Sequence, residues 1–98
     1  MENNANTYYI VRGTNSGLFF GKVRFRSGSE AVLTDCRRLW YWDGACSDFQ
    51  IAMEGVKNTD DCKFTVTVPE ITLTDVIELI PCTETAVKVI LEVPEWKR

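Results

Sequence analysis

The stretch Arg37–Trp42 (RRLWYW) concentrates the side chains of this sequence that are best suited to hold a ligand. Flat aromatic rings beside guanidinium groups can stack a planar molecule and bind its anionic part. In a strand, Arg38, Trp40 and Trp42 lie on one face and Arg37 lies on the other. We therefore expect Trp40 or Trp42 to stack a base-like ring, and Arg37 or Arg38 to meet a phosphate-like group.

Two other interpretations of this stretch stay open. It can be a core strand, with Leu39 and Tyr41 buried and the tryptophans covering a sheet edge or a dimer seam. It can also be a protein-protein hot spot, because Trp, Tyr and Arg are enriched at such sites. Lys22 and Arg24 alternate on a neighbouring strand, and they either form a solvated face or supply charge to the same ligand pocket.

Catalytic residues are not indicated by the sequence. The chain has no histidine, which is the most frequent general base in enzymes. The turn-like segment Gly13–Gly17 lacks the lysine of a phosphate-binding loop, and it is either a simple turn or a loop that touches a ligand. Aspartates such as Asp48 could act as bases, but nothing pairs them with a nucleophile. We predict a protein that is not an enzyme and has no catalytic residue, metal or cofactor.

Composition indicates one small domain. The 98 residues are 45% hydrophobic, and the net charge of −3 argues against broad nucleic-acid binding. No apolar run approaches the ~20 residues of a membrane span, and the polar N-terminus lacks a signal-peptide pattern. We expect a disordered tail over residues 1–7, a single domain over residues 8–98 and a cytoplasmic location.

The four cysteines, at positions 36, 46, 62 and 82, do not form a recognisable metal or redox motif. No pair has Cys-x-x-Cys spacing, and there is no histidine to complete a zinc site. We expect reduced thiols that are mostly buried, as free cysteines usually are. A disulfide framework, a metal site and a reactive thiol are the alternatives.

Local patterns predict six strands and two helices. Hydrophobic alternation and turn residues predict strands over 8–12, 18–25, 30–33, 37–42, 64–68 and 71–80, with a helix over 74–79 as an alternative to the last. Ser47 and Thr83 are expected N-caps. The first helix has Phe49, Ala52, Met53 and Val56 at helical spacing and Gly55 as its C-cap; the second has Ala86, Val87, Ile90 and Leu91 as its buried stripe and ends before Pro94.

Together these elements predict an α+β fold, with a mainly antiparallel sheet of five to six strands and two short helices. Two short helices cover only one face of such a sheet. The other face is then polar or meets a second subunit. The many aromatic residues favour the second possibility, so we expect a homo-oligomer, most simply a dimer, with any ligand pocket near the subunit seam.

Several segments carry a family resemblance: 9–12, 17–21, 33–45, 54–56 and 68–81. From Tyr8 to about Val89, the chain resembles a domain family of unknown function from small bacteriophage and prophage proteins. Cys36 stands where that family usually has a small residue, which weakens a catalytic role for its thiol. The resemblance supplies no catalytic residues.

The resemblance implies a viral accessory protein that acts in the cytoplasm of a host bacterium. Such proteins often counter host defence, and some sequester nucleotide immune signals. The expected function is non-enzymatic binding of a small anionic, nucleotide-like signal by Arg37, Arg38, Trp40, Trp42, Lys22 and Arg24. The alternatives are direct inhibition of a host defence protein and a role as a minor virion or assembly component.

Overall fold

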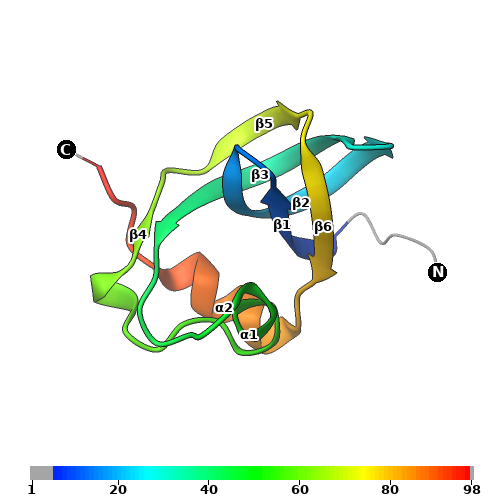
Figure 1. The fold of residues 1–98 in the computed structure, drawn as a ribbon. Coiled ribbons are helices and arrows are strands. Elements are labelled where there is room, and N and C mark those ends of the chain that lie inside the picture. Colours follow the sequence, from blue (N-terminus) through cyan, green and yellow to red (C-terminus); the bar gives the residue numbers. More distant parts are fainter. Residues whose placement is uncertain (1–5, 98) are drawn as a thin grey trace.

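The computed structural model describes residues 6–97, which form a curled antiparallel sheet with two helices beneath it (Figure 1). Residues 1–5 of the predicted tail lie outside the described part. The strands are β1 (Tyr8–Gly13), β2 (Gly17–Ser27), β3 (Glu30–Tyr41), β4 (Lys63–Phe64), β5 (Val68–Leu73) and β6 (Val76–Pro81). The helices are α1 (Asp48–Glu54) and α2 (Glu84–Glu92), and a 3₁₀ turn, η1, spans Thr59–Asp61. The predicted α+β class is confirmed.

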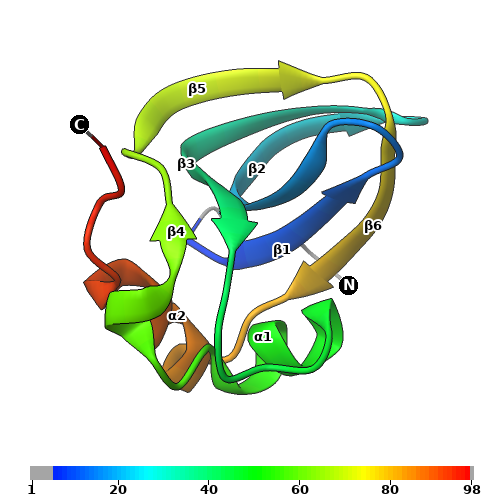
Figure 2. The ribbon, with the colours of Figure 1, turned by 60° about the vertical axis from the view of Figure 1, so that its left-hand side comes forward.

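The sheet has the order β4-β3-β2-β1-β6. Strand β5 also pairs with β3, along its first half, whereas β4 pairs with the end of β3. All of these strand pairings are antiparallel. Strand β5 turns directly into β6, so the two sides of the sheet are joined by a short connection, and the sheet curls round strongly (Figure 2). Asp35, with a φ of 49°, lies in β3 where its register with β2 shifts. Such irregularities bend a strand and support the curl.

The curl gives the sheet a buried core on each face. Phe19 and Phe20 are adjacent in β2 and point to opposite faces, yet both are fully buried. Phe20 packs with Ile10, Leu18 and Leu39 against the helices, while Phe19 packs with Val11, Leu33 and Leu73 inside the curl. The expectation of an uncovered or polar second face was therefore wrong. Oligomerisation stays a prediction, but an uncovered sheet face no longer supports it.

Both helices begin at the predicted caps. The Ser47 hydroxyl accepts a hydrogen bond from the Gln50 N–H, and the Thr83 hydroxyl accepts one from the Ala86 N–H. Gly55 ends α1 with a φ of 81°, a conformation that glycine tolerates best. Helical spacing predicted burial only in part: Ala52, Val56, Ala86 and Ile90 are buried, whereas Phe49, Met53 and Leu91 are exposed.

Several strand boundaries differ from those predicted. The predicted strands over 30–33 and 37–42 are one continuous strand, β3. The segment predicted as a strand over 64–68 is strand only at its ends, where Phe64 closes β4 and Val68 opens β5, and β5 then runs through Pro69. Residues 71–80 form parts of β5 and β6, and they contain no helix. Pro69 is tolerated because, among the described strands, β5 pairs with β3 alone, which leaves the other edge of β5 free of ladder hydrogen bonds.

Candidate functional site

Arg37 is part of the core. Its side chain is on the helix-facing side of β3, and the residue is only 3% exposed. The guanidinium donates to the carbonyls of Thr65 at 2.9 Å and Ile90 at 2.8 Å, with longer contacts of 3.4 Å to Phe64 and Pro94. Burial lowers the pKa of Arg37, and the nearby Glu95 opposes this. Arg37 thus joins β3 to β4, α2 and the segment after α2, and it does not face a ligand pocket.

Arg38 and Trp40 lie together on the opposite face of β3. The Arg38 guanidinium carbon is 4.9 Å from the Phe19 ring centroid and 5.0 Å from the Trp40 ring centroid. The quadrupoles of both rings attract this cation and help to hold it in place. Trp40 is 57% exposed, so this pair is accessible from solvent.

Lys22 and Arg24 are occupied by acidic partners. The Lys22 ammonium is 3.3 Å from the Asp35 carboxylate, and the Arg24 guanidinium is 2.9 Å from the Glu70 carboxylate. Neither side chain is among the described residues that line the cavity of Trp40 and Trp42. The structure therefore does not bring the six predicted residues into one pocket.

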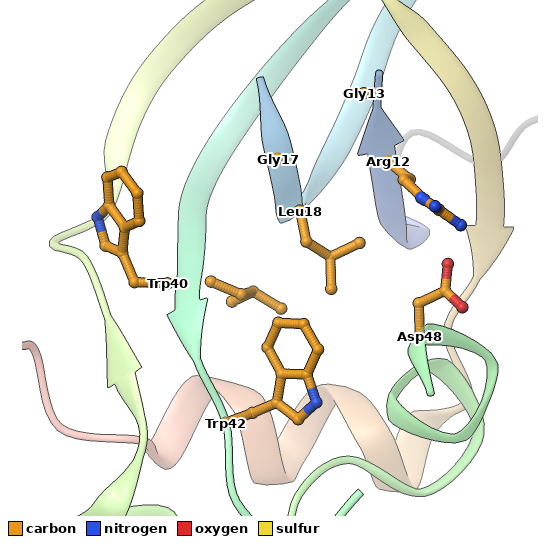
Figure 3. Close-up of a pocket in the computed structure, with 8 residues that line it drawn as sticks. Arg12, Gly13, Gly17, Leu18, Trp40, Trp42 and Asp48 are labelled. Carbon is orange, nitrogen blue, oxygen red and sulfur yellow. The ribbon is translucent and has the colours of Figure 1, made fainter. Parts of the chain in front are cut away.

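Trp40 and Trp42 line a cavity of about 440 Å³, which we name the Trp42 cavity (Figure 3). It lies at the end of β1 and the start of β2, beside the N-terminus of α1. Its lining residues are Arg12, Gly13, Gly17, Leu18, Leu39, Trp40, Trp42 and Asp48. The cavity therefore has aromatic and aliphatic walls and a charged end formed by Arg12 and Asp48.

At the charged end of the Trp42 cavity, the lining residue Asp48 is paired with a second carboxyl group, that of Glu78. Glu78 of β6 lies within hydrogen-bonding reach of Asp48, and this hydrogen bond, with burial and the charge of Asp48, raises the pKa of Glu78. Arg12 opposes the shift from 3.7 Å away. The buried Asp48 Oδ2 and Glu78 Oε1 otherwise lack a hydrogen-bond donor among the described residues. A proton shared between the two carboxyl groups would give these oxygens a partner.

The segment Gly13–Gly17 is a tight β1–β2 turn, and its glycines also line the Trp42 cavity. Asp75, in the β5–β6 turn, holds this segment. Its carboxylate accepts from the Asn15 N–H at 2.7 Å, the Ser16 N–H at 2.8 Å and the Ser16 hydroxyl at 2.7 Å. These hydrogen bonds lower the pKa of Asp75. The turn thus fixes one wall of the cavity.

The four cysteines are free thiols. Burial raises the pKa of Cys36 and of Cys82 to about 12, and it also raises the pKa of Cys62. Thiols with such pKa values are poor nucleophiles near neutral pH. Cys46 is the exposed one.

Sequence reasoning missed Arg12 and Glu78. Their opposite charges face each other across the β1–β6 pair, in a register that joins residues far apart in the chain. Asp48 was considered in the sequence as a possible base, and its neighbour in space, Glu78, was not recognised. Only knowledge that the first and last strands pair would have identified these residues, and local sequence patterns do not reveal that pairing.

The chain belongs to a family described as a domain of unknown function (DUF6948), whose sequence profile matches residues 6–90. The comparisons with curated proteins and with solved structures found no match. Neither described helix has the length and apolar character needed to span a bilayer.

Proposed function

We propose that this domain binds a small nucleotide-like ligand in the Trp42 cavity, without catalysis. The observation that carries the proposal is the combination, in one cavity, of the Trp42 indole ring with the Arg12 guanidinium group. The volume of about 440 Å³ falls within the range of small-ligand pockets, roughly 300–1,000 Å³. A planar base would lie against Trp42, and an anionic group would face Arg12.

The charge of the polar end supports a ligand of this kind. Because its pKa is raised, Glu78 holds its proton to higher pH than an ordinary glutamate. Over that range the protonated Glu78 does not neutralise Arg12, which keeps its donors for an external anion. The side chain of Arg12 is 53% exposed, so it can turn toward a ligand without unpacking the core.

The proposal includes the setting that the family resemblance implies. Binding would sequester a nucleotide-derived immune signal in a bacterium infected by a phage. Expression of the domain would then restore phage growth in cells defended by nucleotide signalling, and the Trp42→Leu variant would not. Equal phage growth with and without the domain would contradict this role.

Calorimetric titration with cyclic and linear nucleotides, each compared with its nucleoside, tests the binding. Base–aromatic stacking contributes about 1–3 kcal/mol, so we expect Trp42→Leu to weaken binding roughly 5- to 150-fold. Trp96→Leu is the matched control, because Trp96 is also partly exposed but does not line the cavity. Arg12→Met should reduce the preference for nucleotide over nucleoside. Absence of binding at high micromolar concentration across the panel would refute the proposal.

A protein-interaction role is the second candidate, and one observation favours it. Phe49 and Met53 are 60% and 46% exposed and lie one turn apart on α1, where they form an apolar stripe without a partner in the described chain. In this role, purified domain would inhibit a host defence protein directly. Phe49→Ser would abolish that inhibition and Trp42→Leu would not, which is the reverse of the pattern expected for ligand binding.

A further inference from the structure

Arg38 is a cation without an acidic partner. None of the ion pairs among residues 6–97 involves Arg38, whereas Lys22 and Arg24 of the adjacent strand each pair with a carboxylate. Its Nε atom is buried and has no hydrogen-bond partner in the described chain. The contacts that hold the guanidinium come instead from the rings of Phe19 and Trp40. A positive charge in such surroundings is available to an external anion.

An apolar cavity of about 260 Å³ opens beside this guanidinium, and we name it the Arg38 cleft. Its lining residues are Phe19, Cys36, Arg38, Thr65, Val66, Val68 and Ile71. The cleft lies where β4 ends and β5 has not begun, so residues 65–67 leave a gap in the strand pairing along β3. Cys36 and Phe19 at its inner end belong to the core inside the curl.

The rim of the Arg38 cleft is fixed by hydrogen bonds. The Thr65 hydroxyl accepts from the Arg38 N–H at 2.9 Å, and the Thr65 N–H donates to the Arg38 carbonyl at 3.0 Å. Arg38 and the opposite wall are therefore held in register. Because burial raises the pKa of Cys36 to about 12, its thiol stays neutral near pH 7 and does not act as the missing counter-ion.

We propose that the Arg38 cleft binds a compact organic anion, a carboxylate with an apolar group of a few carbon atoms. The carboxylate would accept hydrogen bonds from the Arg38 guanidinium in the bidentate geometry that this group favours. The apolar group would lie between Phe19, Val68 and Ile71. This site is separate from the Trp42 cavity, and Figure 3 shows Trp40 and Trp42 on the two sides of the β3 ribbon.

The shape and chemistry of the cleft favour this class over other anions. An inorganic anion would leave the apolar walls without a partner, so it would gain only the contact with one guanidinium. The volume of about 260 Å³ lies below the roughly 300–1,000 Å³ of pockets that enclose larger ligands. A neutral amphiphile would fill the walls and leave Arg38 Nε and the rest of the guanidinium unpaired.

Titration of the intact protein with hexanoate, hexan-1-ol and acetate, followed by NMR, tests the proposal. We expect hexanoate to bind roughly 10- to 100-fold more tightly than either comparison ligand, because one charge-assisted interaction and one apolar contact are each lost. The shifted methyl signals should be those of Val66, Val68 and Ile71. Hexanol or acetate binding as tightly as hexanoate would overturn the proposal, as would the absence of hexanoate binding.

Variants locate the charge. Arg38→Met should abolish the preference for hexanoate over hexanol, while Arg38→Lys should keep part of it. Arg24→Met is the matched control, because it removes a partly exposed arginine of the neighbouring strand that is already paired with Glu70. Trp42→Leu should leave hexanoate binding unchanged, which separates this site from the nucleotide site. Unaltered preference in Arg38→Met would also refute the proposal.

Discussion

Replacement of Arg37 by methionine should destabilise the domain strongly, although Arg37 touches no proposed ligand. Methionine keeps much of the length and apolar volume of arginine but removes every donor. Arg37 makes two short hydrogen bonds, to the Thr65 and Ile90 carbonyls, and two longer contacts. It also lies over the Phe64 ring, with its guanidinium carbon 5.4 Å from the ring centroid.

The expected magnitude follows from these contacts. Hydrogen bonds from a charged group contribute about 1.5–3 kcal/mol each, so the two short ones contribute about 3–6 kcal/mol. Burial of a guanidinium that has no carboxylate contact reduces this gain. In the variant, however, the carbonyls lose their donors, at about 1–3 kcal/mol for each one left buried. We therefore expect Arg37→Met to lower the free energy of unfolding by about 3–5 kcal/mol.

Urea denaturation, followed by tryptophan fluorescence and by far-ultraviolet circular dichroism, measures this change. For a domain of this size each kcal/mol lowers Tm by about 4–8 °C, so a fall of at least about 12 °C is expected. Arg37→Lys should lose less, because an ammonium can still reach one carbonyl. Arg24→Met is the control and should change stability by less than about 1 kcal/mol, as for other exposed ion pairs. A loss below about 1 kcal/mol in Arg37→Met would show that Arg37 is not the structural contact inferred from its burial.

Three further predictions concern titratable groups. The lowered pKa of Asp75 makes the folded state more stable above that pKa and less stable as pH falls through it, so Asp75→Asn should lower stability at neutral pH and flatten its acid dependence in pH-resolved denaturation. The raised pKa of Glu78 has the opposite effect on the pH dependence of stability: the free energy of unfolding should fall as pH rises above the ordinary glutamate range. Glu78→Gln or Asp48→Asn should remove this fall. An unchanged pH profile in these variants would exclude a shared proton. Iodoacetamide should label Cys46 first and leave Cys36 unlabelled in the folded protein, as peptide mass spectrometry would show; equal labelling would contradict its burial.

The fold class and both helix starts could be predicted because their signals are local. Ser47 and Thr83 act within three residues of their own positions, and the β1–β2 hairpin depends on a short turn. The curl of the sheet could not be predicted, since it depends on pairings between β1 and β6 and between β3 and β5. The continuity of β3 was hidden by Thr34-Asp35, which resembles a turn in the sequence and is a bulge in the structure.

The candidate site was predicted in part, for the same reason. Trp40 or Trp42 was expected to stack a ligand; both residues line the Trp42 cavity, but the ring of Trp40 lies on the other side of β3 from that of Trp42, and ligand binding stays a prediction. Alternation along a strand correctly predicted that Arg37 and Arg38 lie on opposite faces. It did not indicate which of the two faces α2 would cover. Arg12, which the sequence gave no reason to select, takes its place at the cavity because β1 lies between β2 and β6.

The pairing of β1 with β6 also sets the order in which this chain can fold during synthesis. β1 is made first, but one of its edges has no partner until Pro81 has left the ribosome, about seventy residues later. Before that point, Ile10 and Val11 expose an apolar strand edge that awaits β6, which favours pairing with other chains. Contacts between distant residues also form slowly. A nascent chain of this domain is therefore most prone to aggregate after β3 has emerged and before β6 has followed it.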